Sequence, residues 1–313
     1  RFEDVVHATG GTLWDASDED IAAAARVASR ADVAVLVLGE RSGLTDDAIS
    51  GEARDRMDIG LPGRQQDLLE AVVATGTPVV LVLIAGRPLA IPWAAERCPA
   101  ILHAWVPGEQ GGVAVADVLT GAVNPGGKLP ITVPRHSGQV PTYYGHRPTG
   151  GHSNWKIEYQ DGSNLPLYPF GFGRSYTRFE LSDLRLSETE IAADGAVEIS
   201  ATVRNTGDRA GDEVVQLYVR DTEASLTRPV KELRGFARVT LEPGEGRTIT
   251  FSLAAEQLAF VDVPGRWLVE PGEFRLMVGT SSAELPLEAT LEVVGLARHI
   301  ESRSRYLTGV SVR

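Results

Sequence analysis

Short apolar runs alternate with helix-like stretches in the first part of the chain, and this alternation restricts the fold more than any other feature. The run over residues 32–38 is continuous, too short for a helix, and ends at Gly39. Three similar runs follow, at residues 78–84, 100–105 and 129–133. Continuous apolar runs of this length are typical of strands that are buried on both faces of a parallel sheet.

Helical signals fill the segments between these runs. Residues 18–31 begin with acids, which the positive end of a helix attracts, and continue through alanines. Residues 61–74 place Pro62 near the first turn, where a helix needs no N–H donor, and a third helix is expected over residues 111–119. Strands and helices with short connections predict a doubly wound, mostly parallel α/β domain over residues 1–135.

The remainder of the chain changes character twice. Proline, glycine, tyrosine and histidine crowd residues 136–177 without periodicity, which predicts an ordered connector. Over residues 178–296, alternating segments such as residues 197–204 and 213–220 are separated by turn residues. About seven short strands at this spacing predict a fibronectin type III-like β-sandwich. Residues 297–313 have little periodicity, and we expect a tail that docks on another domain or is mobile.

Composition excludes several classes of partner. A formal net charge of −12 repels nucleic acid and anionic membrane surfaces, and no arginine or lysine run forms a basic stripe. No apolar run approaches the roughly 20 residues that span a bilayer. The single cysteine, Cys98, permits no intrachain disulfide, and we interpret it as a small buried hydrophobe. Cysteine usage therefore leaves the cellular compartment undetermined.

The candidate chemistry lies in the loop that follows the first apolar run. This acidic loop, residues 39–56, holds five acids and three arginines. Ligands of open α/β sheets bind at the carboxyl ends of the strands, where this loop begins. An ordinary solvated loop has a similar composition, so composition alone leaves both interpretations open.

The sequence lacks the motifs of dinucleotide sites, metal sites and serine hydrolases. Gly108, Gly111 and Gly112 do not form the G-x-G-x-x-G fingerprint of a dinucleotide site. The six histidines lack metal-binding spacing, and Ser42 lacks the G-x-S-x-G frame of a serine hydrolase. We therefore expect no metal and no cofactor.

Several segments resemble glycoside hydrolase family 3, and the resemblance runs in order along nearly the whole chain. The matching segments are SGEARDRMDIGLPGRQQDLL, PVVLVLIAGRPLAI, HAWVPGEQGGVAVADVLTGAVNPGGKLPITVPR, LYPFGFGRSYTRF, VRNTGDRAGDEVVQLYVRD and RPVKELRGF. The resemblance implies an α/β sandwich domain followed by a fibronectin type III-like domain. In this family both follow a (β/α)₈ barrel that carries the nucleophilic Asp. The opening segment resembles the middle of the α/β domain, so we expect its first strand to be absent.

The resemblance also implies one catalytic residue, the general acid/base Glu52. Glu40 is its competitor, but it matches the family's common Gly-Glu pair at a strand end. Acetal cleavage needs an acid that protonates the leaving oxygen and a second carboxylate that supports the developing cation. In retaining enzymes these two carboxyl groups lie roughly 5 to 5.5 Å apart. This chain contains no counterpart of the nucleophile, so we expect it to be inactive without the barrel.

The implied function is thus the acid/base portion of a retaining exo-β-glycosidase of the β-glucosidase type. Its partners would be a β-linked oligosaccharide or glycoside and a barrel domain or chain, with homo-oligomerisation left open. The family resemblance favours a secreted or periplasmic location without deciding against the cytoplasm. The alternative is a non-catalytic carbohydrate-binding or interaction module derived from that family. A third hypothesis is an unrelated α/β nucleotide binder.

Overall fold

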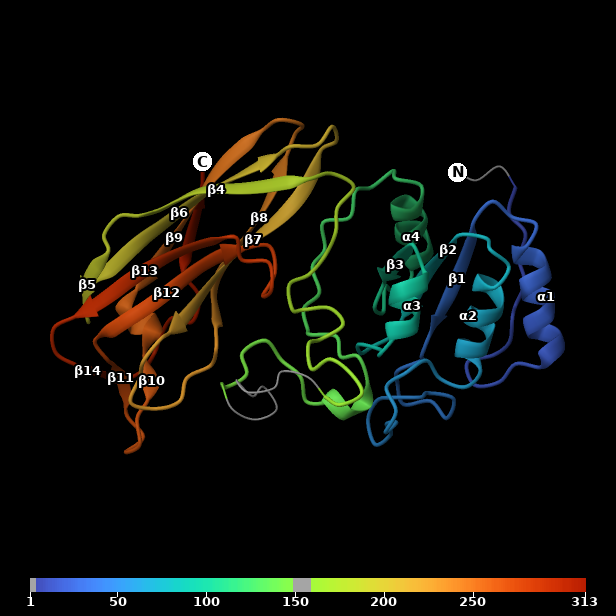
Figure 1. The fold of residues 1–313 in the computed structure, drawn as a ribbon, viewed down its shortest axis with the longest axis horizontal. Helices are drawn as coiled ribbons and strands as arrows, with labels where there is room; N and C mark the ends of the chain where they lie inside the picture. The colour runs from blue at the N-terminus through green and yellow to red at the C-terminus, as the bar shows by residue number, and fades with distance from the viewer. Residues whose placement is uncertain (1–3, 149–158) are drawn as a thin grey trace. The chain divides into compact units, whose positions relative to one another are not determined.

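The computed structural model describes residues 4–148 and 159–313, which form two compact units (Figure 1). The first unit extends to Val123 and also takes in residues 133–142 and 165–168, and the second contains the rest. Residues 149–158, which belong to the predicted connector and include His152, lie outside the described residues. The division into residues 1–135, 136–177, 178–296 and 297–313 stays a prediction.

Three parallel strands form the sheet of the first unit, in the order β1-β2-β3. They are β1 (Ala34–Gly39), β2 (Val79–Ile84) and β3 (Ala100–His103). The helices are α1 (Asp18–Ala28), α2 (Gln65–Val73), α3 (Pro92–Arg97) and α4 (Gly111–Leu119), with a 3₁₀ turn at η1 (Ser137–Gln139). This arrangement confirms the α/β class of the front part of the chain.

The core of the first unit lies between the sheet and its helices. Leu69 of α2, Leu81 of β2 and Leu89 after β2 are each 0% exposed. Burying one such side chain contributes roughly 1.5 to 3 kcal/mol relative to leaving it in water. Helix α1 begins at a capping box in which Ser17 and Asp20 each accept a backbone N–H of the other. Cys98 is 8% exposed and belongs to this core, which confirms its interpretation as a buried hydrophobe.

Three local predictions for residues 1–135 were wrong. Residues 129–133 form no strand, because Pro130 within the run and Pro134 after it cannot donate backbone N–H groups. The backbone contacts of this segment include those of Leu129 with Phe172 and of Val133 with Tyr168. Helix α2 begins at Gln65 rather than residue 61, because a turn occupies residues 63–64. Strand β1 is buried on one face only, since Val35 and Val37 are 44% and 56% exposed. Its other side chains face the core that it shares with α1 and α2.

The second unit contains two larger antiparallel sheets and one small sheet. Their orders are β5-β13-β12-β7-β8, β15-β9-β6-β4 and β10-β11-β14, and only the pairing of β5 with β13 is parallel. The elements are β4 (Phe179–Leu186), β5 (Glu190–Ala192), β6 (Ala196–Asn205), β7 (Gly211–Asp221), β8 (Glu232–Leu241), β9 (Gly246–Ala254), η2 (Ala255–Leu258), β10 (Phe260–Val261), β11 (Trp267–Val269), β12 (Gly272–Gly279), β13 (Leu287–Val294), β14 (Arg298–Ile300) and β15 (Gly309–Val312).

Side chains from the two larger sheets fill one core. Ile199 of β6, Leu217 of β7, Phe251 of β9 and Leu276 of β12 are each 0% exposed. Burial alternates along β6, as a strand with one solvated face requires. The fibronectin type III-like sandwich is confirmed.

Of the two alternatives expected for residues 297–313, docking and mobility, the structure shows docking, because this segment pairs with strands of the second unit. Strand β14 pairs with β11 and strand β15 pairs with β9. Two strands of three and four residues are too short to show a period in the sequence.

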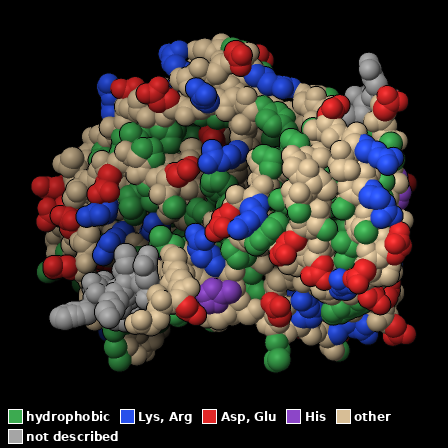
Figure 2. All heavy atoms as spheres, turned by 45° about the vertical axis from the view of Figure 1, so that its right-hand side comes forward, with side chains coloured by type: hydrophobic (Ala, Val, Ile, Leu, Met, Phe, Trp, Pro, Cys, Tyr) green, Lys and Arg blue, Asp and Glu red, His purple; other side chains and the backbone are tan. Residues whose placement is uncertain are grey.

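The surface carries charges of both signs. On the face drawn in Figure 2, acidic and basic side chains are interspersed. Within residues 4–148 and 159–313, no helix combines the length and apolar character that crossing a membrane requires.

Candidate active site

The carboxyl edge of the parallel sheet begins with a close approach between β1 and β2. A Cβ at Gly39 would lie 1.9 Å from the carbonyl oxygen of Ile84, and the φ of Gly39 is +144°. The next backbone N–H, that of Glu40, donates to the same carbonyl at 2.9 Å. The close approach of the two strands therefore requires glycine at position 39. The backbone hydrogen bond of Glu40 fixes where its side chain leaves the sheet.

The side chain of Glu40 is 0% exposed and is fully engaged by cations. Arg87, which follows β2, donates Nε to Oε1 at 2.5 Å and Nη2 to Oε2 at 3.2 Å. Arg56 adds a longer contact to Oε2 at 3.4 Å and donates to the Gly60 carbonyl at 3.0 Å. Buried carboxylates are tolerated when they are paired in this way. Glu40 therefore anchors the loop to the sheet.

Between these contacts the acidic loop folds back on itself. The N–H of Gly43 donates to the Ser50 carbonyl at 3.0 Å, and the N–H of Ile49 donates to the Arg41 carbonyl at 2.8 Å. Ile49 is 3% exposed and fastens the loop to the unit. The Ser42 and Ser50 hydroxyls are 2.9 Å apart. The loop is thus an ordered structure rather than a freely solvated segment.

Glu52 occupies the corner of a tight turn at the tip of this loop. The N–H of Arg54 reaches the Gly51 carbonyl at 3.4 Å, which closes the turn around Glu52 and Ala53. Ala53 has a φ of +59°, a conformation that costs a residue with a Cβ about 1 kcal/mol. The carboxylate of Glu52 is exposed and has no hydrogen-bond or ion-pair partner among the described residues. It is therefore available to a ligand.

The other acids of the loop differ from Glu52 in their partners or their place. Asp47 pairs with Arg41, and the hydroxyl of Thr45 is the main cause that lowers the pKa of Asp47. Asp55 pairs with Arg87, and the Arg56 N–H, followed by the charge of Arg87, lowers the pKa of Asp55. These carboxylates are ionised and held by arginines.

Asp46 is the remaining acid of the loop, and it matches Glu52 in availability. It is exposed, has no hydrogen-bond or ion-pair partner among the described residues, and precedes Glu52 by six residues in the loop. Its chemistry makes it a natural control for Glu52.

Two aromatic side chains, His103 and Trp105, lie at the end of β3. His103 has its ring centroid 5.8 Å from that of Trp105 and 6.4 Å from that of Tyr168. Burial lowers the pKa of His103 to about 4, so its ring is neutral at ordinary pH, and its Nε2 finds no partner among the described residues. Trp105 has a φ of +54°, which is rare for a bulky residue. In the sequence, both residues could be located from their position at the end of a predicted strand.

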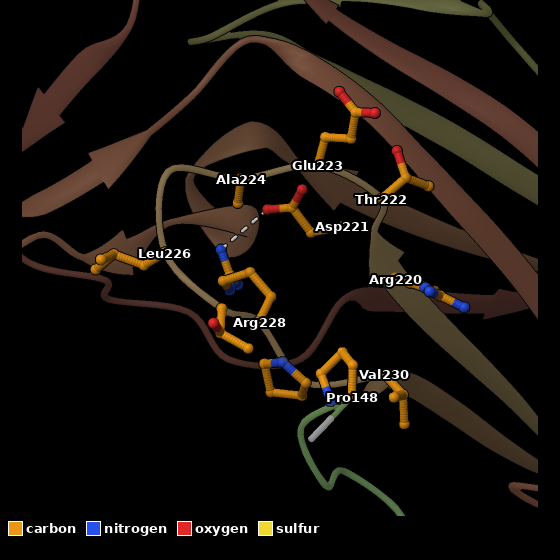
Figure 3. Close-up of a pocket in the computed structure, with 11 residues that line it drawn as sticks. Pro148, Arg220, Asp221, Thr222, Glu223, Ala224, Leu226, Arg228 and Val230 are labelled. Atoms are coloured by element: carbon orange, nitrogen blue, oxygen red, sulfur yellow. Dashed lines mark hydrogen bonds and ion pairs between the residues drawn. The ribbon is translucent and has the colours of Figure 1, made fainter. Parts of the chain in front are cut away.

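The second unit also contains cavities, which are lined by its own residues. One, of about 280 Å³, lies inside the connection between β7 and β8. There the Asp221 carboxylate and the Arg228 guanidinium point toward one another, with Nη1 and Oδ2 3.2 Å apart (Figure 3). Across the described part of both units, no three His, Cys, Asp or Glu side chains converge as metal ligands.

These features define a class: an α/β unit with a carboxylate-bearing loop at its sheet edge, followed in the chain by a β-sandwich. Residues 3–176 match the model of the glycosyl hydrolase family 3 C-terminal domain, and residues 213–282 match that of a fibronectin type III-like domain. The first match covers more than half of the chain. The chain belongs to glycosyl hydrolase family 3.

Known relatives agree with this assignment. A periplasmic β-glucosidase of Salmonella typhimurium is 45% identical over 84% of the chain, and a β-xylosidase of Formosa agariphila is 45% identical over 88%. A crystal structure of a β-glucosidase from Listeria innocua in complex with glucose is 38% identical, with a TM-score of 0.83 over 91% of the chain. The chain spans only 34% and 37% of the two relatives and 39% of the crystallised chain.

Proposed function

We propose that this chain supplies the general acid/base, Glu52, to a retaining exo-β-glycosidase whose nucleophilic Asp lies on a (β/α)₈ barrel. The single observation that carries the proposal is the geometry of the Glu52 turn. An exposed carboxylate, without a partner among residues 4–148 and 159–313, lies at the tip of a loop that ion pairs tie to the sheet. The substrate class is a β-linked glucoside or xyloside, in keeping with the names of the relatives.

The chemistry requires a carboxyl group that both gives and takes a proton. Glu52 would protonate the departing oxygen while the nucleophile forms a glycosyl–enzyme intermediate, and would then deprotonate the water that releases the sugar. In the complete enzyme, meaning this chain joined to or combined with the barrel, the barrel would bring the charged nucleophile next to Glu52 and would exclude water from the pair. The solvated setting of Glu52 in this chain alone lacks both influences.

Glu52→Gln tests the role because acid catalysis matters most for poor leaving groups. In the complete enzyme we expect kcat/KM to fall by about 1000-fold for an alkyl glycoside and far less for a dinitrophenyl glycoside. Asp46→Asn is the matched control, since it neutralises the other unpartnered acid of the same loop. Equal, small losses on both substrates for Glu52→Gln would remove Glu52 from this role.

The barrel is a separate part of the proposal with its own test. One carboxylate cannot carry out a double displacement, so we expect no turnover from these 313 residues alone and turnover after a barrel is supplied. Clear glycosidase activity of the purified chain by itself, free of contaminating enzyme, would contradict this part. We also propose a secreted or periplasmic location, which the name of the Salmonella relative supports.

A further inference from the structure

The Glu40–Arg87 ion pair lies where both limbs of the acidic loop meet the sheet. Glu40 directly follows β1, and Arg87 lies shortly after β2, 47 residues further along the chain. Their side chains are 0% and 19% exposed. We propose that Glu40 and Arg87 are positioning residues that fix the Glu52 turn in the orientation that proton transfer needs. This inference rests on the proposed function of Glu52.

The limb that leads into the turn is fixed to Glu40. The Ser50 hydroxyl, two residues before Glu52, reaches Oε1 of Glu40 at 3.4 Å. Ser50 is itself 6% exposed, and its hydroxyl also contacts that of Ser42. The approach to Glu52 is therefore held by a polar chain that ends on a buried carboxylate.

The limb that leaves the turn is fixed to the same pair from the other side. Asp55, three residues after Glu52, accepts from Nη1 of Arg87. Arg56 reaches Oε2 of Glu40 and is 14% exposed. Arg87 thus uses one edge of its guanidinium for Glu40 and the remaining nitrogen for Asp55. A planar fork can satisfy this geometry, whereas a lysine ammonium cannot.

Charge keeps the bridge intact. Burial alone would lower the pKa of Arg87, but the hydrogen bond and charge of Glu40, together with Asp55, raise it. Arg87 therefore keeps its positive charge in the bridge. Displacing a catalytic group by about 1 Å costs on the order of 100-fold in rate, so losing either anchor should reach Glu52.

Hydrogen exchange of the 313-residue chain tests the positioning directly. Arg87→Met removes the bridge. Asp55→Asn weakens only the contact of Arg87 with Asp55, whose side chain is 70% exposed, and leaves the buried Glu40–Arg87 pair in place. Arg26→Met is the control, because Arg26 pairs with Glu19 on the exposed face of α1. We expect about tenfold faster exchange at Ile49 and Arg54 in both loop variants, with β2 amides and the control unchanged. Unchanged loop protection in folded Arg87→Met and Asp55→Asn would overturn the inference.

Activity then separates the positioning role from the role of Glu52. In the complete enzyme, Arg87→Lys should lower kcat for an alkyl glycoside by about 100-fold, leave KM nearly unchanged and spare the dinitrophenyl glycoside. If exchange rises as expected but both glycosides lose activity equally, positioning of the loop stands and the acid/base role of Glu52 falls. If exchange stays at the wild-type rate, the positioning inference falls whatever the kinetics show.

Discussion

Replacing Asp221 with asparagine should change how the stability of the second unit depends on pH. The Asp221 side chain is 6% exposed beside Arg228, at the cavity between β7 and β8 (Figure 3). Burial raises the pKa of Asp221 from 3.8 to about 6, Glu270 and Glu232 add repulsion, and the charge of Arg228 acts in the opposite direction. The direction of this pKa shift determines whether the group stabilises the folded chain at low or at high pH.

A raised pKa means that the folded chain binds this proton more tightly than the unfolded chain. Its stabilising contribution is fully present below pH 3.8 and is lost as the pH rises through about 6. The shift of roughly two units corresponds to about 3 kcal/mol in all. Between about pH 4.5 and 7.5, the wild-type free energy of unfolding should fall by about 2 kcal/mol through this group. Asp221→Asn should lack this component.

Urea unfolding followed by hydrogen exchange of β7 and β8 measures the effect in the second unit alone. The useful quantity is the difference between variant and wild type at the two pH values, because other titrating groups cancel in it. We expect the asparagine variant to gain about 2 kcal/mol relative to wild type on going from the acidic to the neutral buffer. A constant difference at both pH values would refute the reasoning.

Three further predictions concern other parts of the chain. Gly39→Ala should destabilise the first unit by about 2 kcal/mol or more, because its Cβ would lie 1.9 Å from the Ile84 carbonyl oxygen; a loss below about 0.5 kcal/mol in urea unfolding would contradict this. Burial raises the pKa of the Cys98 thiol, so a thiol reagent should modify it only as fast as the unit opens, and immediate stoichiometric labelling would argue otherwise. Deleting residues 309–313 should speed amide exchange at Thr248 in β9, whose N–H donates to the Arg313 carbonyl at 2.8 Å, and unchanged protection there would show that β15 does not pair in solution.

Sequence patterns predicted the elements whose signals are local. The predicted helix over residues 111–119 coincides with α4, and the strands β1, β2 and β3 lie within one or two residues of the predicted runs. Turn residues and alternation were sufficient for the sandwich. Local signals failed where contacts with other elements decide the structure. One face of β1 exposes Val35 and Val37, and β14 and β15 form by pairing with β11 and β9.

The candidate site divides in the same way. The sequence singled out the acidic loop and, through family resemblance, Glu52, whose catalytic role stays a prediction. It did not reveal the contact of Glu40 with Arg87, because 47 residues separate them and only the adjacency of β1 and β2 brings them together. Nor did it separate the paired acids Asp47 and Asp55 from the unpartnered Glu52. That distinction depends on side-chain geometry.

Rescue of Glu52→Ala by azide in the complete enzyme tests the central claim most directly. Without its general base, the glycosyl–enzyme formed from a dinitrophenyl glycoside should accumulate, since water attacks it slowly. Azide needs no proton removed, so it should restore turnover and yield a glycosyl azide with the β configuration. If azide neither accelerates Glu52→Ala nor yields that product, Glu52 is not the acid/base that this chain supplies.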